Sequence, residues 1–190
     1  MTSIQLFWLF LGTTWAVIEI VIALKTRVKL NTIGHLEYRS ESLIWMVVAL
    51  ALSLSLWVKQ MHLAALPIPI FYRQFIAILF FLSGLALRCY AVFSLGKFFS
   101  TTVMTSDKHI LVEKGPYRLI RHPAYTGLFI SFIAAGFAMG DTLALLTLTI
   151  PITYVLIQRI RIEEQWLTDH FGKVYESYSL RTKKLIPWIY

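Results

Sequence analysis

The sequence predicts an all-α integral membrane protein with about five transmembrane helices. Of its 190 residues, 57% are hydrophobic and only 15% are charged, whereas soluble domains carry roughly 25% charged residues. The apolar residues gather in runs that approach or exceed the roughly 20 residues needed to cross a bilayer. The length fits a single membrane domain that takes up residues 1–190.

Five apolar runs are predicted as spans, and the fourth is the shortest of them. It reaches spanning length only if its helix begins near Pro123, because proline suits the first turn of a helix. Gly140 and Asp141 then form a tight turn, so we expect the last two spans to pair as a helical hairpin. The predicted spans are residues 4–24, 43–63, 71–95, 126–139 and 142–160.

The basic residues predict how the chain is oriented. Lysine and arginine gather between the first and second spans, between the third and fourth, and after the fifth, while the alternate loops are nearly free of them. Loops rich in these residues stay in the cytoplasm. We therefore expect the N-terminus outside, the C-terminus in the cytoplasm, and contacts between the net charge of +8 and anionic membrane lipids. No aromatic and basic stacking pattern indicates binding to nucleic acid.

The sequence excludes several kinds of site. Cys89 is the one cysteine, so neither an intramolecular disulfide nor a cysteine metal cluster can form. No two histidines lie within one helical turn, so we expect no metal. Gly-x-Gly does not occur, which excludes a Rossmann-type nucleotide fingerprint. A P-loop and a Gly-x-Ser-x-Gly motif are also missing, so any cofactor must be held by another device.

A dense polar and aromatic cluster occupies residues 115–127. Pro123 favours an extended backbone at His122 before a helix begins. Backbone N–H groups and the helix dipole favour a carboxylate or phosphate at such a helix start. An alternative is a belt of Tyr and Arg at the membrane surface, which does not account for His-Pro-x-Tyr behind Gly-Pro-Tyr. The side chains placed near this helix start are Tyr117, Arg121, His122 and Tyr125.

A second cluster follows the fifth span. Arg159 and Glu163 are four residues apart and therefore share one helix face. Ionisable groups at a membrane boundary often mark a substrate path, although a plain surface ion pair, worth less than about 1 kcal/mol, is the alternative. Glu19, inside the first apolar run, receives no assignment from the sequence.

The two clusters together resemble the isoprenylcysteine carboxyl methyltransferase family. No single motif is specific, but the ordered set, with a short helical hairpin between its halves, is. The resemblance covers residues 96–190, and the first two spans match only in being apolar. The motifs are His109-Ile110-Leu111-Val112, Gly115-x-Tyr117, Arg121-His122-Pro123-x-Tyr125, Arg159-x-x-x-Glu163-Glu164, Phe171-Gly172-x-x-Tyr175-x-x-Tyr178 and Pro187.

The resemblance implies a membrane methyltransferase that uses S-adenosyl-L-methionine without a Rossmann domain. Residues 1–95 then supply three N-terminal spans, and residues 96–190 form the cofactor-binding and catalytic region. Arg159 is implied as the catalytic, substrate-facing residue, and Thr102 stands where the family often has a glutamine. The implied cofactor-binding residues are His109, Ile110, Leu111, Val112, Tyr117, His122, Pro123, Ala124, Tyr125 and Glu163.

The expected methyl acceptor is a lipophilic small molecule or a lipid-modified substrate. A carboxylate, as in isoprenylcysteine O-methylation, has a pKa of about 4 and needs no general base at neutral pH. Arg159 can grip it as a bidentate fork. A phospholipid amine or a thiol would need a proton removed, by His122 or a tyrosinate.

Two other classes of function stay open from the sequence. One is a nicotinamide-dependent membrane reductase, because some sterol reductases share a similar His-Pro-x-Tyr region. The other is a non-catalytic scaffold or lipid-binding anchor.

Overall fold

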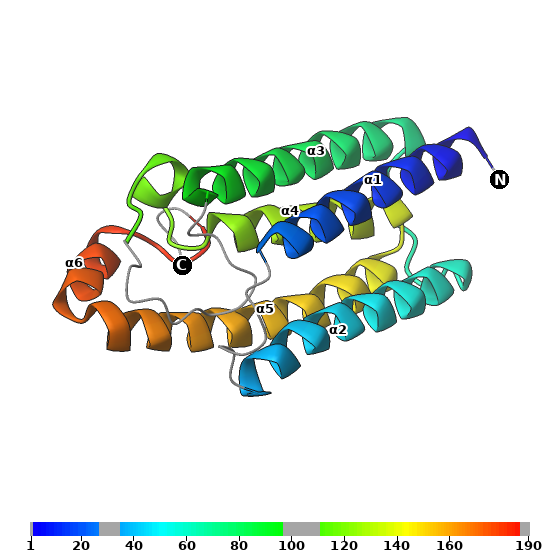
Figure 1. Cartoon of the computed structure of the whole chain (residues 1–190). Coiled ribbons are helices and arrows are strands. Elements are labelled where there is room, and N and C mark those ends of the chain that lie inside the picture. The colour runs from blue at the N-terminus through cyan, green and yellow to red at the C-terminus, as the bar shows by residue number, and fades with distance from the viewer. Residues whose placement is uncertain (1, 27–34, 97–110, 187–190) are drawn as a thin grey trace.

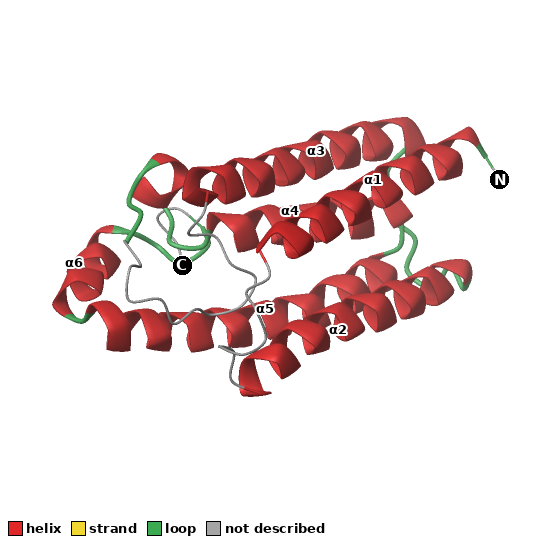
Figure 2. Ribbon diagram, viewed as in Figure 1, coloured by secondary structure: helices red, strands yellow, loops and turns green. Residues whose placement is uncertain are grey.

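The computed structural model describes residues 2–26, 35–96 and 111–186. In these residues the regular elements are helices (Figure 2), and the β pairing consists of two isolated bridges, Ala65 with Asp141 and Ile120 with Lys183. The elements are α1 (Ser3–Thr26), α2 (His35–Gln60), α3 (Ile70–Leu95), the 3-10 helix η3 (Gly115–Arg118), α4 (Pro123–Met139), α5 (Thr142–Phe171) and α6 (Lys173–Arg181).

The prediction of an all-α, multi-pass membrane protein is confirmed. Among the described residues, four helices, α1, α2, α3 and α5, are long and apolar enough to cross a membrane. The fifth apolar helix, α4, starts at Pro123 as predicted and has 17 residues. At about 1.5 Å per residue it is about 25 Å long, slightly less than the roughly 30 Å of hydrocarbon. α5 runs beyond the predicted end at residue 160 and continues as one helix to Phe171.

The helices form two groups that lie roughly parallel (Figure 1). α3 packs along α4, and α2 packs along α5. The contact between α3 and α4 depends on two glycines, because a Cβ on Gly84 would lie 2.6 Å from the carbonyl oxygen of Gly127. A Cβ on Gly127 would lie 2.5 Å from the carbonyl oxygen of Gly84. Small residues of this kind let helix backbones approach closely in membranes.

The turn between α4 and α5 is tied to the segment between α2 and α3. Gly140 ends α4 in the left-handed conformation, with φ of 77°, which glycine adopts without steric cost. One carboxylate oxygen of Asp141 accepts a hydrogen bond from the Ala144 N–H at 3.0 Å, and the other accepts one from the Ala64 N–H at 2.8 Å. These backbone hydrogen bonds hold the pKa of the Asp141 carboxyl below its usual range.

α1 contacts the rest of the bundle through large side chains on one face. Trp8 donates a hydrogen bond to the Gln74 side chain of α3 at 2.6 Å. Trp15 packs edge-on against Phe132 of α4, with ring centroids 5.4 Å apart. Glu19 lies on the same face and is 2% exposed, so α1 carries a carboxylate into the interior of the bundle.

Arg88 of α3 pairs with that carboxylate. Its Nε and Nη2 atoms donate to the two oxygens of Glu19 at 2.9 and 2.8 Å. Its Nη1 atom donates to the carbonyl oxygen of Ala124, in the first turn of α4, at 3.4 Å. The structure thus gives Glu19 a partner that the sequence did not indicate.

Candidate functional site

The polar residues predicted as a site gather at the end of the bundle opposite the turn at Gly140. η3, the start of α4, the end of α5 and α6 meet there (Figure 1). Gly115 opens η3 with φ of 59°, a conformation that favours glycine. Pro116 and Tyr117 of this short helix are buried. The site is therefore built on the start of α4, the end of α5 and the short helix α6, beside the compact turn of η3.

The backbone before α4 is fixed by a segment from the end of the chain. We call residues 182–185 the C-terminal strap. The N–H of Arg121 donates to the carbonyl oxygen of Lys183 at 2.7 Å, and the N–H of His122 donates to that of Lys184 at 3.0 Å. The Thr126 hydroxyl donates to the carbonyl oxygen of Leu185 at 2.8 Å. The side chain of His122 does not cap α4. The backbone at His122 is instead held by its hydrogen bond to the strap.

Glu164 of α5 lies at the centre of this arrangement. One of its oxygens accepts a hydrogen bond from Arg121 Nε at 2.8 Å and lies 3.3 Å from His122 Nε2. The other oxygen is 2.8 Å from Lys184 Nζ. The hydroxyl of Tyr175 is 3.5 Å from the first oxygen. Three other segments of the chain, the turn before α4, α6 and the C-terminal strap, therefore converge on this one carboxylate of α5.

Arg121 also closes the end of α6. Its Nη1 atom donates to the carbonyl oxygens of Ser179 and Thr182 at 2.8 and 2.6 Å. These carbonyls have no partner inside the helix, and a cation near them is stabilising. Arg121 thus connects the turn before α4, the end of α6 and the C-terminal strap.

The tyrosines around the site are hydrogen-bond donors. Tyr178 donates to the carbonyl oxygen of Tyr117 at 2.8 Å. Burial raises the pKa of Tyr178 to about 12 and raises the pKa values of Tyr117 and Tyr175 further above their ordinary value. These three phenols stay protonated near neutral pH, which disfavours them as the tyrosinate base that the sequence left open.

The predicted substrate-facing and cofactor-facing residues lie close together. Arg159 of α5 is 3% exposed. The side chain of Tyr125 lies within hydrogen-bonding reach of both Arg159 and Glu163. Glu163 Oε2 is 4.0 Å from His122 Nδ1. That oxygen is buried and has no hydrogen-bond partner in the described part of the chain, which leaves an acceptor available for a ligand.

The structure describes most of the predicted site residues. Tyr117, Pro123 and Ala124 are buried beside His122 and Tyr125 at this end of the bundle. Leu111 and Val112 are half-buried in the segment that leads to η3. The predicted residues His109 and Ile110, and Thr102, lie outside the described residues.

Sequence reasoning missed three contributors: Glu164, Tyr175 and Lys184. Glu164 stands in the Arg159-x-x-x-Glu163-Glu164 motif, which was the one signal for it. Tyr175 appears only in the Phe171-Gly172-x-x-Tyr175-x-x-Tyr178 motif, without a role, and Lys184 only among the basic residues after the fifth span. Their contacts join distant parts of the chain, so no local pattern predicts them.

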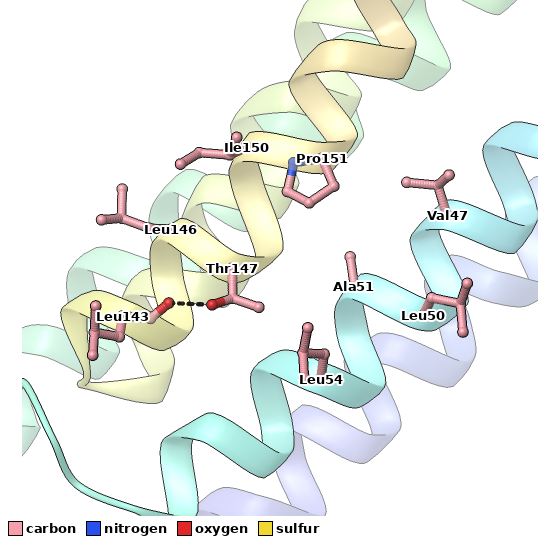
Figure 3. Close-up of a pocket in the computed structure, with 9 residues that line it drawn as sticks. All are labelled: Val47, Leu50, Ala51, Leu54, Leu143, Leu146, Thr147, Ile150 and Pro151. Carbon is pink, nitrogen blue, oxygen red and sulfur yellow. Dashed lines mark hydrogen bonds between the residues drawn. The ribbon is translucent and has the colours of Figure 1, made fainter.

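An apolar groove lies elsewhere, between α2 and the first half of α5 (Figure 3). Its volume is about 500 Å³. The one polar side chain in its lining, Thr147, donates its hydroxyl to the Leu143 carbonyl oxygen at 2.7 Å, so the surface is effectively hydrocarbon. The groove precedes Arg159 by two turns of α5 and contains none of the predicted site residues. Its lining is Val47, Leu50, Ala51, Leu54, Leu143, Leu146, Thr147, Ile150 and Pro151.

Comparison with known proteins identifies the family. The model of the isoprenylcysteine carboxyl methyltransferase family matches residues 75–169, half of the chain. The chain belongs to this family. The matched region contains the His122 segment, Arg159 and Glu163, so the resemblance predicted from these motifs is confirmed at the level of the family.

Individual members of the family match part of their own length. The chain is 28% identical over 120 residues to a probable protein-S-isoprenylcysteine O-methyltransferase of Oryza sativa subsp. indica, covering 62% of this chain and 63% of that protein. It is 33% identical over 108 residues to the protein-S-isoprenylcysteine O-methyltransferase of Schizosaccharomyces pombe, covering 56% of this chain and 46% of that protein.

A solved structure agrees in fold. The eukaryotic intramembrane Ras methyltransferase ICMT superposes with a TM-score of 0.65 at 26% identity, over 76% of this chain and 52% of that one. The chain therefore spans roughly half to two thirds of the length of the relatives described here.

Proposed function

We propose that this protein is a membrane methyltransferase that moves a methyl group from S-adenosyl-L-methionine to the carboxylate of a lipophilic acceptor. The observation that carries this proposal is the buried guanidinium of Arg159 beside Tyr125, with the unpartnered oxygen of Glu163 close by. Membership of the family supports it, because the relatives in rice and fission yeast are named as protein-S-isoprenylcysteine O-methyltransferases.

The residues present fit this cofactor. A buried carboxylate oxygen without a partner suits an ammonium group, and Glu163 offers one. The uncapped start of α4 suits a carboxylate. We assign the binding of the cofactor to Glu163, to the buried turn, and to the segment before it. The assigned residues are His109, Ile110, Leu111, Val112, Tyr117, His122, Pro123, Ala124 and Tyr125.

Once bound, the cofactor supplies an electrophilic methyl group on a sulfonium. The protein's task is therefore to align this methyl group with the acceptor and to exclude water. Arg159 is assigned to the acceptor, where its planar guanidinium can hold both oxygens of a carboxylate. Tyr125, which lies within hydrogen-bonding reach of Arg159, would help to hold the guanidinium in place. Alignment of this kind can supply about 7–11 kcal/mol of the barrier.

A carboxylate acceptor also fits the acid–base properties of the site. It is ionised at neutral pH, because its pKa is about 4, and needs no proton removed. The raised pKa values of Tyr117, Tyr175 and Tyr178 leave these phenols protonated. Their role is then to donate hydrogen bonds and to pack, which matches the contact of Tyr178 with the Tyr117 carbonyl oxygen.

The position of the site at a helix-bundle end suits an acceptor that is partly dissolved in the membrane. The polar head would meet Arg159 while its apolar tail stays among the helices. We also propose that this end faces the cytoplasm, because basic residues such as Arg118, Lys173 and Lys183 lie at it. In this proposal residues 1–95 serve mainly as membrane anchor, and residues 96–190 hold the reacting groups.

The assignment of roles is tested by cofactor titration of purified protein in lipid nanodiscs. We expect Arg159→Ala to bind S-adenosyl-L-methionine within about threefold of wild type but to lose methyl transfer, because Arg159 serves the acceptor. Glu163→Gln is expected to weaken cofactor binding at least about tenfold, because a charge-assisted hydrogen bond is lost. If Arg159→Ala were the variant that lost the cofactor, the assignment would be wrong. Parallel thermal shifts with a nicotinamide cofactor test the reductase alternative.

A further inference from the structure

We propose that Glu164 is a positioning residue that couples the C-terminal strap to the cofactor site through His122. This inference rests on the proposed function and names a residue outside its predicted set. Both oxygens of Glu164 are already engaged, by Arg121, His122 and Lys184. A carboxylate occupied in this way has little capacity left for a ligand, so its effect on the reaction passes through the groups it holds.

The first group held by Glu164 is the imidazole of His122. The ring is 3% exposed and lies between two carboxylates, with Nε2 3.3 Å from Glu164 and Nδ1 4.0 Å from Glu163. A partner on one ring nitrogen sets the orientation of the ring and the tautomer presented by the other. Glu164 thus determines what His122 presents toward Glu163, where the cofactor is assigned.

The second group is the C-terminal strap. Lys184 reaches Glu164 from the strap, and Arg121 binds both Glu164 and the carbonyl oxygen of Thr182. Two carbonyl oxygens of the strap in turn accept hydrogen bonds from the backbone N–H groups of Arg121 and His122. Side-chain and backbone contacts therefore connect the same two segments, and Glu164 is the anchor on α5 that both share.

This connection makes strap docking and cofactor binding reciprocal. If a docked strap improves cofactor affinity by some factor, bound cofactor must favour the docked strap by the same factor. Exposed Arg181 comes just before the strap. Within the strap, buried Thr182 is followed by exposed Lys183. Trypsin cleavage after Lys183 therefore reports how often the strap leaves its place, since a protease needs the segment released.

The first measurement is the dissociation constant of S-adenosyl-L-methionine for Glu164→Gln in the full chain. Loss of the charged partner that orients His122 is expected to weaken cofactor binding about 10- to 100-fold, the range expected for a lost hydrogen bond to a charged group. Glu113→Gln is the matched control, because Glu113 pairs with Arg181 at 3.1 Å on the exposed surface. It should leave the dissociation constant within about twofold. The KM for the acceptor should stay within about twofold in both variants, which a general collapse of the site would not allow.

The second measurement is the rate of trypsin cleavage after Lys183, with and without S-adenosyl-L-methionine. Wild type should be protected by the cofactor, whereas Glu164→Gln should be cleaved faster and lose most of that protection. Lys184→Gln, which removes a half-exposed partner and should fold normally, is expected to change both quantities in the same direction by less.

The outcomes separate the two proposals. Wild type that does not bind the cofactor overturns the proposed function, and the coupling with it. Wild type that binds while Glu164→Gln binds equally well overturns the coupling alone. Weaker cofactor binding with unchanged strap cleavage also overturns the coupling, because Glu164 would then act on His122 without the strap.

Discussion

The buried ion pair between Glu19 and Arg88 yields the sharpest stability prediction. We consider Glu19→Gln, which keeps the size of the side chain and removes its charge. The two side chains are 2% and 7% exposed and share two hydrogen bonds of 2.8 and 2.9 Å. Removing one partner of such a pair leaves an uncompensated buried charge and costs about 3–5 kcal/mol. That is a large part of the roughly 5–15 kcal/mol that stabilises most domains.

Removing both partners is expected to cost less than removing one. In Glu19→Leu combined with Arg88→Met, no charge stays buried, and apolar side chains of similar size fill the space. The lost hydrogen bond to the Ala124 carbonyl oxygen adds about 1 kcal/mol. We therefore expect the double variant to cost about 2 kcal/mol or less.

The assay is equilibrium unfolding in mixed micelles, followed by circular dichroism and tryptophan fluorescence. The exposed pair of Glu113 with Arg181 provides the control, and Glu113→Gln should cost less than about 1 kcal/mol. A Glu19→Gln variant as stable as this control would contradict the expected penalty for an unpaired buried charge. The single variants Glu19→Leu and Arg88→Met are measured beside the double variant. A double variant that costs the sum of these two would also contradict it, since the penalty depends on an unpaired charge.

Three further predictions concern single contacts. Gly127→Ala should lower the melting temperature and cost about 1–3 kcal/mol, because the new Cβ would lie 2.5 Å from the Gly84 carbonyl oxygen; an unchanged melting temperature would contradict the close helix contact. Tyr178→Phe should cost about 1–3 kcal/mol in the same unfolding assay by leaving the buried Tyr117 carbonyl oxygen without its donor, whereas an effect below the error of the assay would show that this bond adds nothing. Because folding lowers the pKa of Asp141, its contribution should be complete above about pH 4 and fall as the pH drops further; Asp141→Asn should remove this part of the pH dependence of the melting temperature, and an unaltered profile would count against it.

Much of the fold follows from local patterns in the sequence. Apolar runs predict the helices, Pro123 predicts where α4 begins, and the Gly140-Asp141 pair predicts the turn of the hairpin. The spacing of Arg159 and Glu163 predicts that both face the same side, and both lie beside Tyr125. Each of these features depends on residues that are close together in the sequence.

The end of α5 was not predicted, for a physical reason. The apolar run stops near residue 160, but Glu, Gln and Leu are good helix formers in water. The helix therefore continues to Phe171 and carries Glu164 to its partners. Hydropathy locates where a helix leaves the apolar region, not where its hydrogen bonds end.

The contacts between distant segments were also beyond prediction. Glu19 with Arg88, and Glu164 with Lys184, join residues that only the packing of helices brings together. A single charge in an apolar run signals that a partner exists but does not say which residue it is. The same limit applies to the strap, whose backbone hydrogen bonds to Arg121 and His122 have no signature in the sequence.

The proposed reaction is methyl transfer to a lipophilic carboxylate by the cluster around His122, Glu163 and Arg159. Its most direct test is to incubate purified protein in nanodiscs with S-adenosyl-L-methionine labelled on the methyl group and a prenylated cysteine whose carboxylate is free. We expect wild type to form a labelled methyl ester and Arg159→Ala to form none. Label that stays on the cofactor with wild type, or an ester formed equally by Arg159→Ala, would contradict it.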